Sequence, residues 1–372
     1  MDFPIAEYKS RLARTQAEIR ARKLDALLVH QPENVLYLSG FHTTGFFMYH
    51  ALVVPTEGEP VLILRGMEDQ AAAATSWVEQ RFTYADTEEP ISATRRALQA
   101  LKLDAAKIGI DHHSWFLTLD RYATLRELLP RVRFERDDQT IDRQRLIKTP
   151  LEIEALRTAA RIVEAGVQAG IDAIAPDVSE RDLAKAIFTA LIDAGGEPPL
   201  FGNITTGPRT LQLHGQWTDR RIERGDQIYY EISGVSRHYF SKLMRTTVLG
   251  EPSADQSRTA EILLRAQDEG IAKMRAGAAA IDIDRACRDP VLRAGLRETY
   301  PNRVGYSTGL TYRPSSGEFL REFMPDSDWT LEAGMVLHML LMAKGIGFSD
   351  TILVTEGGPE YLTRFDRKLF VR

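Results

Sequence analysis

Two side chains in the second half of the sequence could carry out hydrolytic chemistry. His214 lies in the segment TTGPRTLQLHGQ, between two strand-like runs. Imidazole changes charge near neutral pH, so a histidine at a pocket rim can move protons during bond cleavage. Glu231 ends the apolar run IYYE and, on a strand, shares a face with Tyr229. A carboxylate in a pocket can act as base, nucleophile or cation binder. The alternatives are a surface-loop histidine and a solvent-facing glutamate.

The elements predicted before these residues alternate between helix and strand, which is typical of an α/β domain. The predicted helices cover 5–23, 68–80, 93–101 and 118–129, and the predicted strands cover 24–31, 35–40, 51–55, 61–65, 107–111 and 132–138. A polar stretch, DRQRLIKTP, follows, and we place the domain boundary there, near Lys148.

The elements predicted around the two candidate residues form a second domain. Thr149 can cap its first helix and Pro150 suits the first helical position. The predicted helices cover 151–174, 180–194, 256–276 and 283–300, and the predicted strands cover 202–206, 228–234, 239–249, 305–310, 335–343 and 348–355. A helix pair followed by strands occurs twice, which indicates an internal repeat.

The segment RGDQIYYEISGVSRHYFSKLMRTTVLG, from Arg224 to Gly250, resembles the metal-binding hairpin of the creatinase, prolidase and methionine aminopeptidase superfamily, the pita-bread fold. The resemblance implies a creatinase-type N-terminal α/β domain over 1–147 and an α+β pita-bread catalytic domain with an internal pseudo-repeat over 148–372. In metal-dependent members two aspartates of this hairpin hold a dinuclear centre. Here Glu231 and Lys242 stand in those two places. An ammonium group there would repel a dication.

The other three ligand places of the superfamily are also altered. Tyr306 replaces a histidine, Leu340 replaces a glutamate, and the last glutamate falls on Ser349 or Asp350, of which Asp350 fits better. His338 lies two residues before Leu340 and could project into the pocket in its stead. A divalent pair needs several carboxylates, so we expect no metal and no other cofactor. Tyr306 could instead be a packed aromatic, His338 a core histidine and Asp350 a strand-end cap.

The phrases YYEISGVSRHYFSKLMRT and GYSTGLTYRPSSGEF resemble the metal-free members of the superfamily, creatinase and the ectoine hydrolases. Met244 and Leu340 stand where creatinase-like enzymes hold the guanidinium with acids, which makes creatine an unsuitable substrate. The ectoine-hydrolase branch is therefore the better match.

The resemblance implies a role for each candidate residue. His214 moves a proton between water and the departing nitrogen, Glu231 is the nucleophile or base, and Asp350 orients the site or balances its charge. The expected substrate-binding residues of the same domain are Lys242, Arg245, Tyr306, Tyr312 and His338.

The resemblance also implies a homodimer in which the N-terminal domain of one subunit covers the active site of the other. By that likeness Phe46, Phe47, Tyr49 and His50, in TTGFFMYH, would line the partner's pocket. Aromatic residues so close together could also be ordinary core.

The composition excludes several functional classes. The chain has 372 residues, a net charge of −5 and 44% hydrophobic residues, as expected of a globular protein with two domains. No block of Lys and Arg resembles a nucleic-acid-binding arm, and no apolar run approaches the roughly 18 residues of a membrane span. The N-terminal stretch has no signal-peptide core, and the single cysteine, Cys287, fits a reducing compartment. We therefore expect a cytoplasmic protein without nucleic-acid or membrane partners.

These patterns predict a metal-independent hydrolase of a C–N bond, in a cyclic amidine or amide, within a small zwitterionic nitrogen compound. Two alternatives stay open. One is a non-catalytic binding protein on the same scaffold. The other is an Xaa-Pro peptidase-like metallohydrolase, in which Glu231, His338 and Asp350 bind a single metal.

Overall fold

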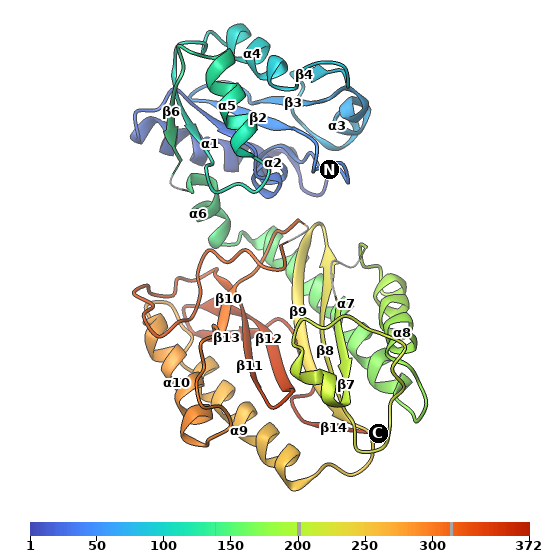
Figure 1. Ribbon diagram of the computed structural model, residues 1–372. Coiled ribbons are helices and arrows are strands. Elements are labelled where there is room, and N and C mark those ends of the chain that lie inside the picture. Colours follow the sequence, from blue (N-terminus) through green and yellow to red (C-terminus); the bar gives the residue numbers. More distant parts are fainter. Residues whose placement is uncertain (138, 199–201, 313–314) are drawn as a thin grey trace. The chain divides into compact units, whose positions relative to one another are not determined.

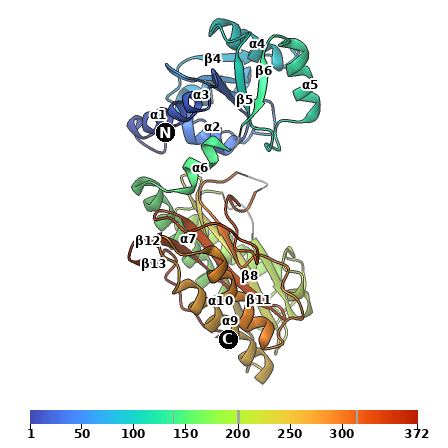
Figure 2. The same cartoon turned by 90° about the vertical axis from the view of Figure 1, so that its left-hand side faces the viewer.

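The computed structural model describes residues 1–137, 139–198, 202–312 and 315–372. The chain forms two compact units, Met1–Gln144 and Arg145–Arg372, and each is described by itself (Figures 1 and 2). The predicted boundary near Lys148 lies a few residues after this division. Among the described residues, no helix combines the length and apolar character needed to cross a membrane.

The N-terminal unit is built on a mixed six-stranded sheet in the order β4-β3-β2-β1-β5-β6. Its strands are β1 (Ala26–Val29), β2 (Ala51–Pro55), β3 (Val61–Arg65), β4 (Arg81–Tyr84), β5 (Lys107–Ile110) and β6 (Arg133–Arg136). Its helices are α1 (Ile5–Ala21), α2 (Pro32–Ser39), α3 (Asp69–Thr75), α4 (Ile91–Ala100) and α5 (Leu119–Leu128), and α6 (Thr140–Leu146) spans the boundary. Alternate residues of β1, β2 and β3 pack on α4 and form one core.

One prediction for this unit is wrong. Residues 35–40, expected as a strand, belong to helix α2. Pro32 occupies its first turn, and Gly40 ends it with a φ of 75°, a left-handed conformation that glycine adopts without strain. All eight residues of α2 are buried, and its apolar run Val35–Leu38 is continuous, so the sequence shows no helical periodicity there.

The C-terminal unit contains four long helices and one large sheet. The helices are α7 (Pro150–Ala173), α8 (Glu180–Asp193), α9 (Ala254–Ile271) and α10 (Ala280–Arg293). The strands are β7 (Gly202–Thr206), β8 (Gln227–Ser236), β9 (Tyr239–Val248), β10 (Gly305–Ser307), β11 (Val336–Ala343), β12 (Ile346–Thr355), β13 (Gly358–Tyr361) and β14 (Phe370–Val371). The sheet order is β10-β11-β12-β9-β8-β7, with β13 beside β12 and β14 beside β9.

The predicted internal repeat is visible in this order. The first half runs α7, α8, β7, β8, β9 and the second α9, α10, β10, β11, β12, and the two halves meet where β9 pairs with β12. Each helix pair packs on the strands of its own half (Figure 1). Thr149 caps α7 in a reciprocal capping box with Glu152, as the sequence predicted.

The helices cover only one face of the sheet. Tyr230, Ile232 and Leu243 belong to the core under α7 and α8, and Met339 and Phe348 belong to the core under α9 and α10. Because side chains alternate along a strand, their neighbours project to the opposite face. That uncovered face carries the candidate site.

Candidate active site

A cavity of about 1010 Å³ lies on the uncovered face of the C-terminal sheet. Strand pairing arranges the side chains of this face in rows. The first row, defined by the register across four strands, consists of Glu231, Met244, Ser349 and Leu340. The second row consists of Ser233, Lys242, Thr351, His338 and Tyr306. Sequence-distant residues thus become neighbours through backbone pairing alone.

Glu231 is the acidic centre of the cavity. Its Oε1 atom lies 2.6 Å from Nζ of Lys242, and its Oε2 atom accepts hydrogen bonds from Tyr229 at 3.3 Å and Asn203 at 3.2 Å. Burial favours the neutral acid, but Lys242 and His338 together outweigh it and hold the pKa of Glu231 well below its usual range. Glu231 is therefore a carboxylate at neutral pH, the form in which a base or a nucleophile acts.

Lys242 remains an ammonium although it is buried. Burial disfavours its charge, but the Glu231 carboxylate raises the pKa of Lys242 above its ordinary value. Its Nζ atom also donates a hydrogen bond of 2.8 Å to the Tyr306 hydroxyl. Burial raises the pKa of Tyr306, so the phenol keeps its proton. Glu231, Lys242 and Tyr306 form a continuous polar chain from β8 through β9 to β10.

His338 is a neutral histidine beneath this chain. Its side chain is fully buried, its Nε2 atom lies 3.6 Å from Oε1 of Glu231, and its ring lies 5.1 Å from the Tyr306 ring between centroids. Burial lowers the pKa of His338 to about 4. Neither ring nitrogen forms a hydrogen bond within the described part of the chain.

His214 reaches the cavity from the loop between β7 and β8. It lies in a turn just after the 3-10 helix Gly207–Leu211, and its exposed side chain lines the cavity. Gln216 in the same loop donates to Asn203 at 3.4 Å, and Asn203 donates to Glu231. The loop that carries His214 is therefore tied to the carboxylate through two amide side chains.

The base of this loop is fixed by a buried carboxylate at the start of α8. Glu180 accepts hydrogen bonds from the backbone amides of Thr206, at 2.9 Å, and Thr218, at 2.8 Å, and from both hydroxyls. Arg209, inside the loop, forms an ion pair with it. Glu180 thus joins the start, the middle and the end of the segment around His214.

Two residues expected in the pocket lie on the opposite face. Arg245 is fully buried and donates to Oδ1 of Asp350 at 2.9 Å, and Oδ2 of Asp350 lies 3.2 Å from Nε of Arg367. The even-numbered residues of β12 face the helices, so Asp350 stabilises the fold there and Ser349 occupies the cavity side. This corrects the expectation that Asp350 and Arg245 act on a substrate. Within the described residues, Oγ of Ser349 forms no hydrogen bond.

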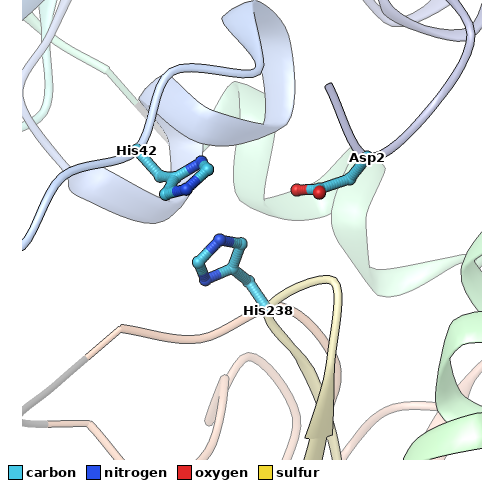
Figure 3. Close-up of side chains that lie close together, drawn as sticks. All are labelled: Asp2, His42 and His238. Atoms are coloured by element: carbon cyan, nitrogen blue, oxygen red, sulfur yellow. The ribbon is translucent and has the colours of Figure 1, made fainter. Parts of the chain in front are cut away.

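Tyr312 stacks on His238, with ring centroids 5.5 Å apart and planes 7° apart. His238 lies in the tight turn between β8 and β9 (Figure 3). Asp2 and His42, which Figure 3 also labels, belong to the N-terminal unit. Tyr312 is not among the described residues that line the cavity.

The four candidates of the N-terminal unit divide into surface and core. Phe47 is 66% exposed, and Phe46 contacts both Phe47 and Phe116. Tyr49 is buried and its hydroxyl bonds to Thr94 at 2.7 Å. His50 is buried against the carbonyl of Met48, and burial lowers its pKa to about 4. The structure therefore corrects the expectation for Tyr49 and His50, which are held in the core of their own unit.

Sequence patterns missed two features of the cavity. Asn203 lies opposite Glu231 in the β7–β8 register, which only the strand pairing reveals. Arg303 and Glu322 form an ion pair in the cavity wall, and they come from irregular segments with no periodic signal.

The cavity does not fit a dinuclear metal centre. A hard dication needs several carboxylate oxygens, whereas the two rows offer Glu231 alone. Its Oε1 atom is already paired with the Lys242 ammonium, and Leu340 and Tyr306 fill two further ligand places with an apolar group and a protonated phenol. The donors of these two rows therefore do not form a dinuclear site.

Comparison with known proteins agrees with this architecture. Residues 11–147 match the Creatinase/Prolidase N-terminal domain, and residues 154–356 match Metallopeptidase family M24. The ectoine hydrolase of Halomonas elongata is 28% identical over 100% of this chain and 99% of its own length. An uncharacterized hydrolase/peptidase of Sinorhizobium fredii is also 28% identical, over 100% of this chain and 99% of its own length.

Solved structures show the same fold. The dipeptidase PepE of Mycobacterium ulcerans has a TM-score of 0.86 at 24% identity, covering 99% of both chains. The prolidase of Pyrococcus horikoshii has a TM-score of 0.84 at 24% identity, covering 97% of this chain and 99% of the prolidase. Since one family model spans more than half of the sequence, the chain belongs to metallopeptidase family M24, a family of hydrolases, and carries a creatinase/prolidase N-terminal domain.

Proposed function

We propose that this protein is a metal-independent hydrolase that opens a C–N bond in a small zwitterionic nitrogen compound. The carrying observation is the Lys242 ammonium, which lies 2.6 Å from Glu231 in place of a metal ligand. The likeness to an ectoine hydrolase over the whole chain supports a non-peptide C–N bond, in a cyclic amidine or an amide. We further propose that the enzyme acts as a cytoplasmic homodimer.

Glu231 and His214 divide the chemistry in this proposal. Either Glu231 takes a proton from water, whose oxygen then bonds to the carbon, or the Glu231 carboxylate attacks the carbon and water later releases it. In both routes the C–N bond breaks, the electron pair stays on nitrogen, and His214 delivers a proton to that nitrogen and regains one from the water that is consumed. The products are a carboxylate, or an amide from an amidine, and an amine. Lys242 and Tyr306 donate towards the oxygen or nitrogen that gains charge.

Single substitutions test these roles on a panel of ectoine-like, creatine-like and N-acyl amino compounds. We expect Glu231→Gln and His214→Ala each to lower kcat by about 100-fold or more, because each removes a proton-transfer or nucleophilic group. Gln212→Ala, in the same loop and cavity wall as His214, is the matched control and should retain most turnover. After single turnover in 18O-labelled water, label found in Glu231 by mass spectrometry would establish the nucleophilic route, with water attacking the Glu231 carbonyl carbon.

Metal analysis tests the proposed independence from metal. The purified protein should hold far less than one equivalent of divalent metal, and chelation should leave kcat unchanged. Activity that disappears on chelation and returns with added metal would replace this proposal with a metallohydrolase. Tight binding of a panel compound with no turnover by the wild type would show a binding protein instead.

A further inference from the structure

We propose that the part of the cavity around Glu231, Lys242 and Tyr306 selects a neutral carboxamide with a short apolar acyl chain. Lys242 and Tyr306 would hold its carbonyl oxygen. This inference rests on the proposed C–N hydrolysis and narrows it, since it disfavours a cationic amidinium as the bound group.

The first argument is charge. Two acidic side chains line the described cavity, Glu231 and Glu322, and each already has a cationic partner, Lys242 and Arg303 respectively. His338, which faces Glu231 from β11, is neutral at pH 7. An amidinium that approached Glu231 would therefore meet the Lys242 ammonium, and like charges repel strongly where water is excluded. A neutral amide meets no such penalty.

The second argument is hydrogen bonding. An ammonium has three N–H donors, and Lys242 directs two of them at Glu231 and the Tyr306 hydroxyl. No third acceptor for Lys242 occurs among the described residues. Tyr306 accepts from Lys242, so its own O–H remains available to donate. Two donors polarised by one positive charge suit a single carbonyl oxygen, and they would strengthen their hold as that oxygen becomes an oxyanion.

The third argument is the apolar surface beside these donors. Tyr229, Met244, Leu340 and Met342 form one buried cluster with Tyr306. Met244 and Leu340 share the first row with Glu231, where related enzymes place acidic groups. An acyl chain of a few carbons would cover this surface and gain the free energy of apolar burial, whereas a polar or charged chain would be left without partners.

A matched pair of ligands tests the inference directly. N-ethylbutyramide and the N-ethylbutyramidinium cation share one heavy-atom skeleton and differ in charge. By ligand-observed NMR titration at pH 7, the wild type should bind the amide at least tenfold more tightly than the cation. Lys242→Arg should keep that order because it keeps the positive charge, and Lys242→Met should reverse it because Glu231 is then left to pair with the cation.

Two further variants guard against a folding defect. Lys242→Met leaves a buried carboxylate unpaired, so thermal unfolding by circular dichroism is measured in parallel. Lys242→Met with Glu231→Gln removes both charges together and should lose at least tenfold in amide affinity, because the charged donor is gone. Glu231→Gln alone leaves Lys242 unpaired and should bind butyrate at least tenfold more tightly than the wild type.

The outcomes separate the two proposals. Equal or tighter binding of the cation by the wild type, or an equal loss of both ligands in Lys242→Met, would overturn the amide inference. Hydrolysis of amidines by such a protein would still uphold the proposed function. Selective amide binding without turnover of any C–N substrate would uphold the amide inference and contradict the proposed hydrolysis.

Discussion

At the scale of single residues, the site combines groups whose charges are fixed by one another. Glu231 is a carboxylate because Lys242 is an ammonium, and the reverse holds equally. His338 is neutral because burial outweighs the nearby carboxylate. The pair and the histidine therefore respond to pH in different ranges.

His338 should make the C-terminal unit less stable as the pH falls. Its pKa is about 4 in the folded chain against 6.5 for the free group, so between these values the unfolded chain binds a proton that the folded chain does not. The free energy of unfolding should fall over that range, by up to about 3 kcal/mol from this group. His338→Leu should flatten the loss in urea-unfolding curves recorded from pH 4 to 7.

The Glu231 contribution has a different range. Its folded pKa is depressed, so its stabilising effect is complete above the unfolded value of about 4.3 and is lost only below it. Between pH 4.5 and 6.5 the free energy of unfolding should therefore depend on pH less steeply in His338→Leu than in the wild type. Parallel curves for the two proteins would contradict the assignment to His338, since Glu231 has no effect in this range.

At the scale of elements, the loop that carries His214 is anchored to the start of a helix. Thr206 and Thr218, which flank the 3-10 helix Gly207–Leu211 and the turn with His214, both donate backbone hydrogen bonds to Glu180 at the first turn of α8. The position of His214 thus depends on a residue outside the cavity.

Glu180→Gln should lower both stability and turnover. The substitution keeps the shape but removes the charge that Arg209 and the two threonines bind, which costs about 1–3 kcal/mol, with roughly 2–4 °C in Tm for each kcal/mol. We expect kcat to fall several-fold with a smaller change in KM, because His214 is misplaced while the other cavity walls remain. Steady-state kinetics and thermal unfolding measure both effects.

Asp219→Asn is the control for this prediction. It removes an exposed ion pair with Arg181 at the same end of α8, and surface pairs contribute little. A Glu180→Gln enzyme with wild-type kcat would show that the loop holds His214 without this anchor. Recovery of kcat in Glu180→Asp would support positioning over a general loss of fold.

Sequence reasoning succeeded where local patterns decide the structure. The cap at Thr149, the two helix pairs and the β8–β9 hairpin follow from capping residues, periodicity and turn residues. It failed at α2, whose eight residues are all buried and so carry no periodic contrast. Helix α6 was also not predicted, because its mostly polar residues form no apolar stripe.

The site was predictable to the extent that a single strand or motif defines it. The structure brings Glu231, Lys242, Tyr306 and His338 close together. The choice between Ser349 and Asp350 depends on which of two adjacent residues faces the cavity, and a shift of one residue reverses every side chain of a strand. Only the pairing of β12 with β9 and β11 settles that parity.

At the scale of the whole molecule, the N-terminal unit exposes several large apolar side chains. Phe47, Trp115 and Leu119 are 66%, 70% and 89% exposed, and Phe46 and Phe116 lie in ring contact beside them. Apolar groups gathered in this way are typical of association surfaces. They are the residues on which the proposed homodimer would depend.

Phe47→Asp and Trp115→Asp should each shift the protein from dimer to monomer, because a charge in an apolar interface is poorly solvated. Light scattering coupled to size-exclusion chromatography measures the change in mass. Ile192→Asp, on the exposed side of α8 and 59% exposed in the wild type, should leave the mass unchanged. A wild type that is monomeric at micromolar concentration would rule out the proposed dimer.

The one-sided covering of the C-terminal sheet has an evolutionary consequence. The helix-facing residues of its strands, Arg245 and Asp350 included, pack in the core, while the other face carries the side chains of the cavity. Natural selection can therefore act on the residues of the two faces separately, for folding on one face and for reactivity on the other. Met244 next to Arg245, and Ser349 next to Asp350, place one residue of each face side by side on a single strand.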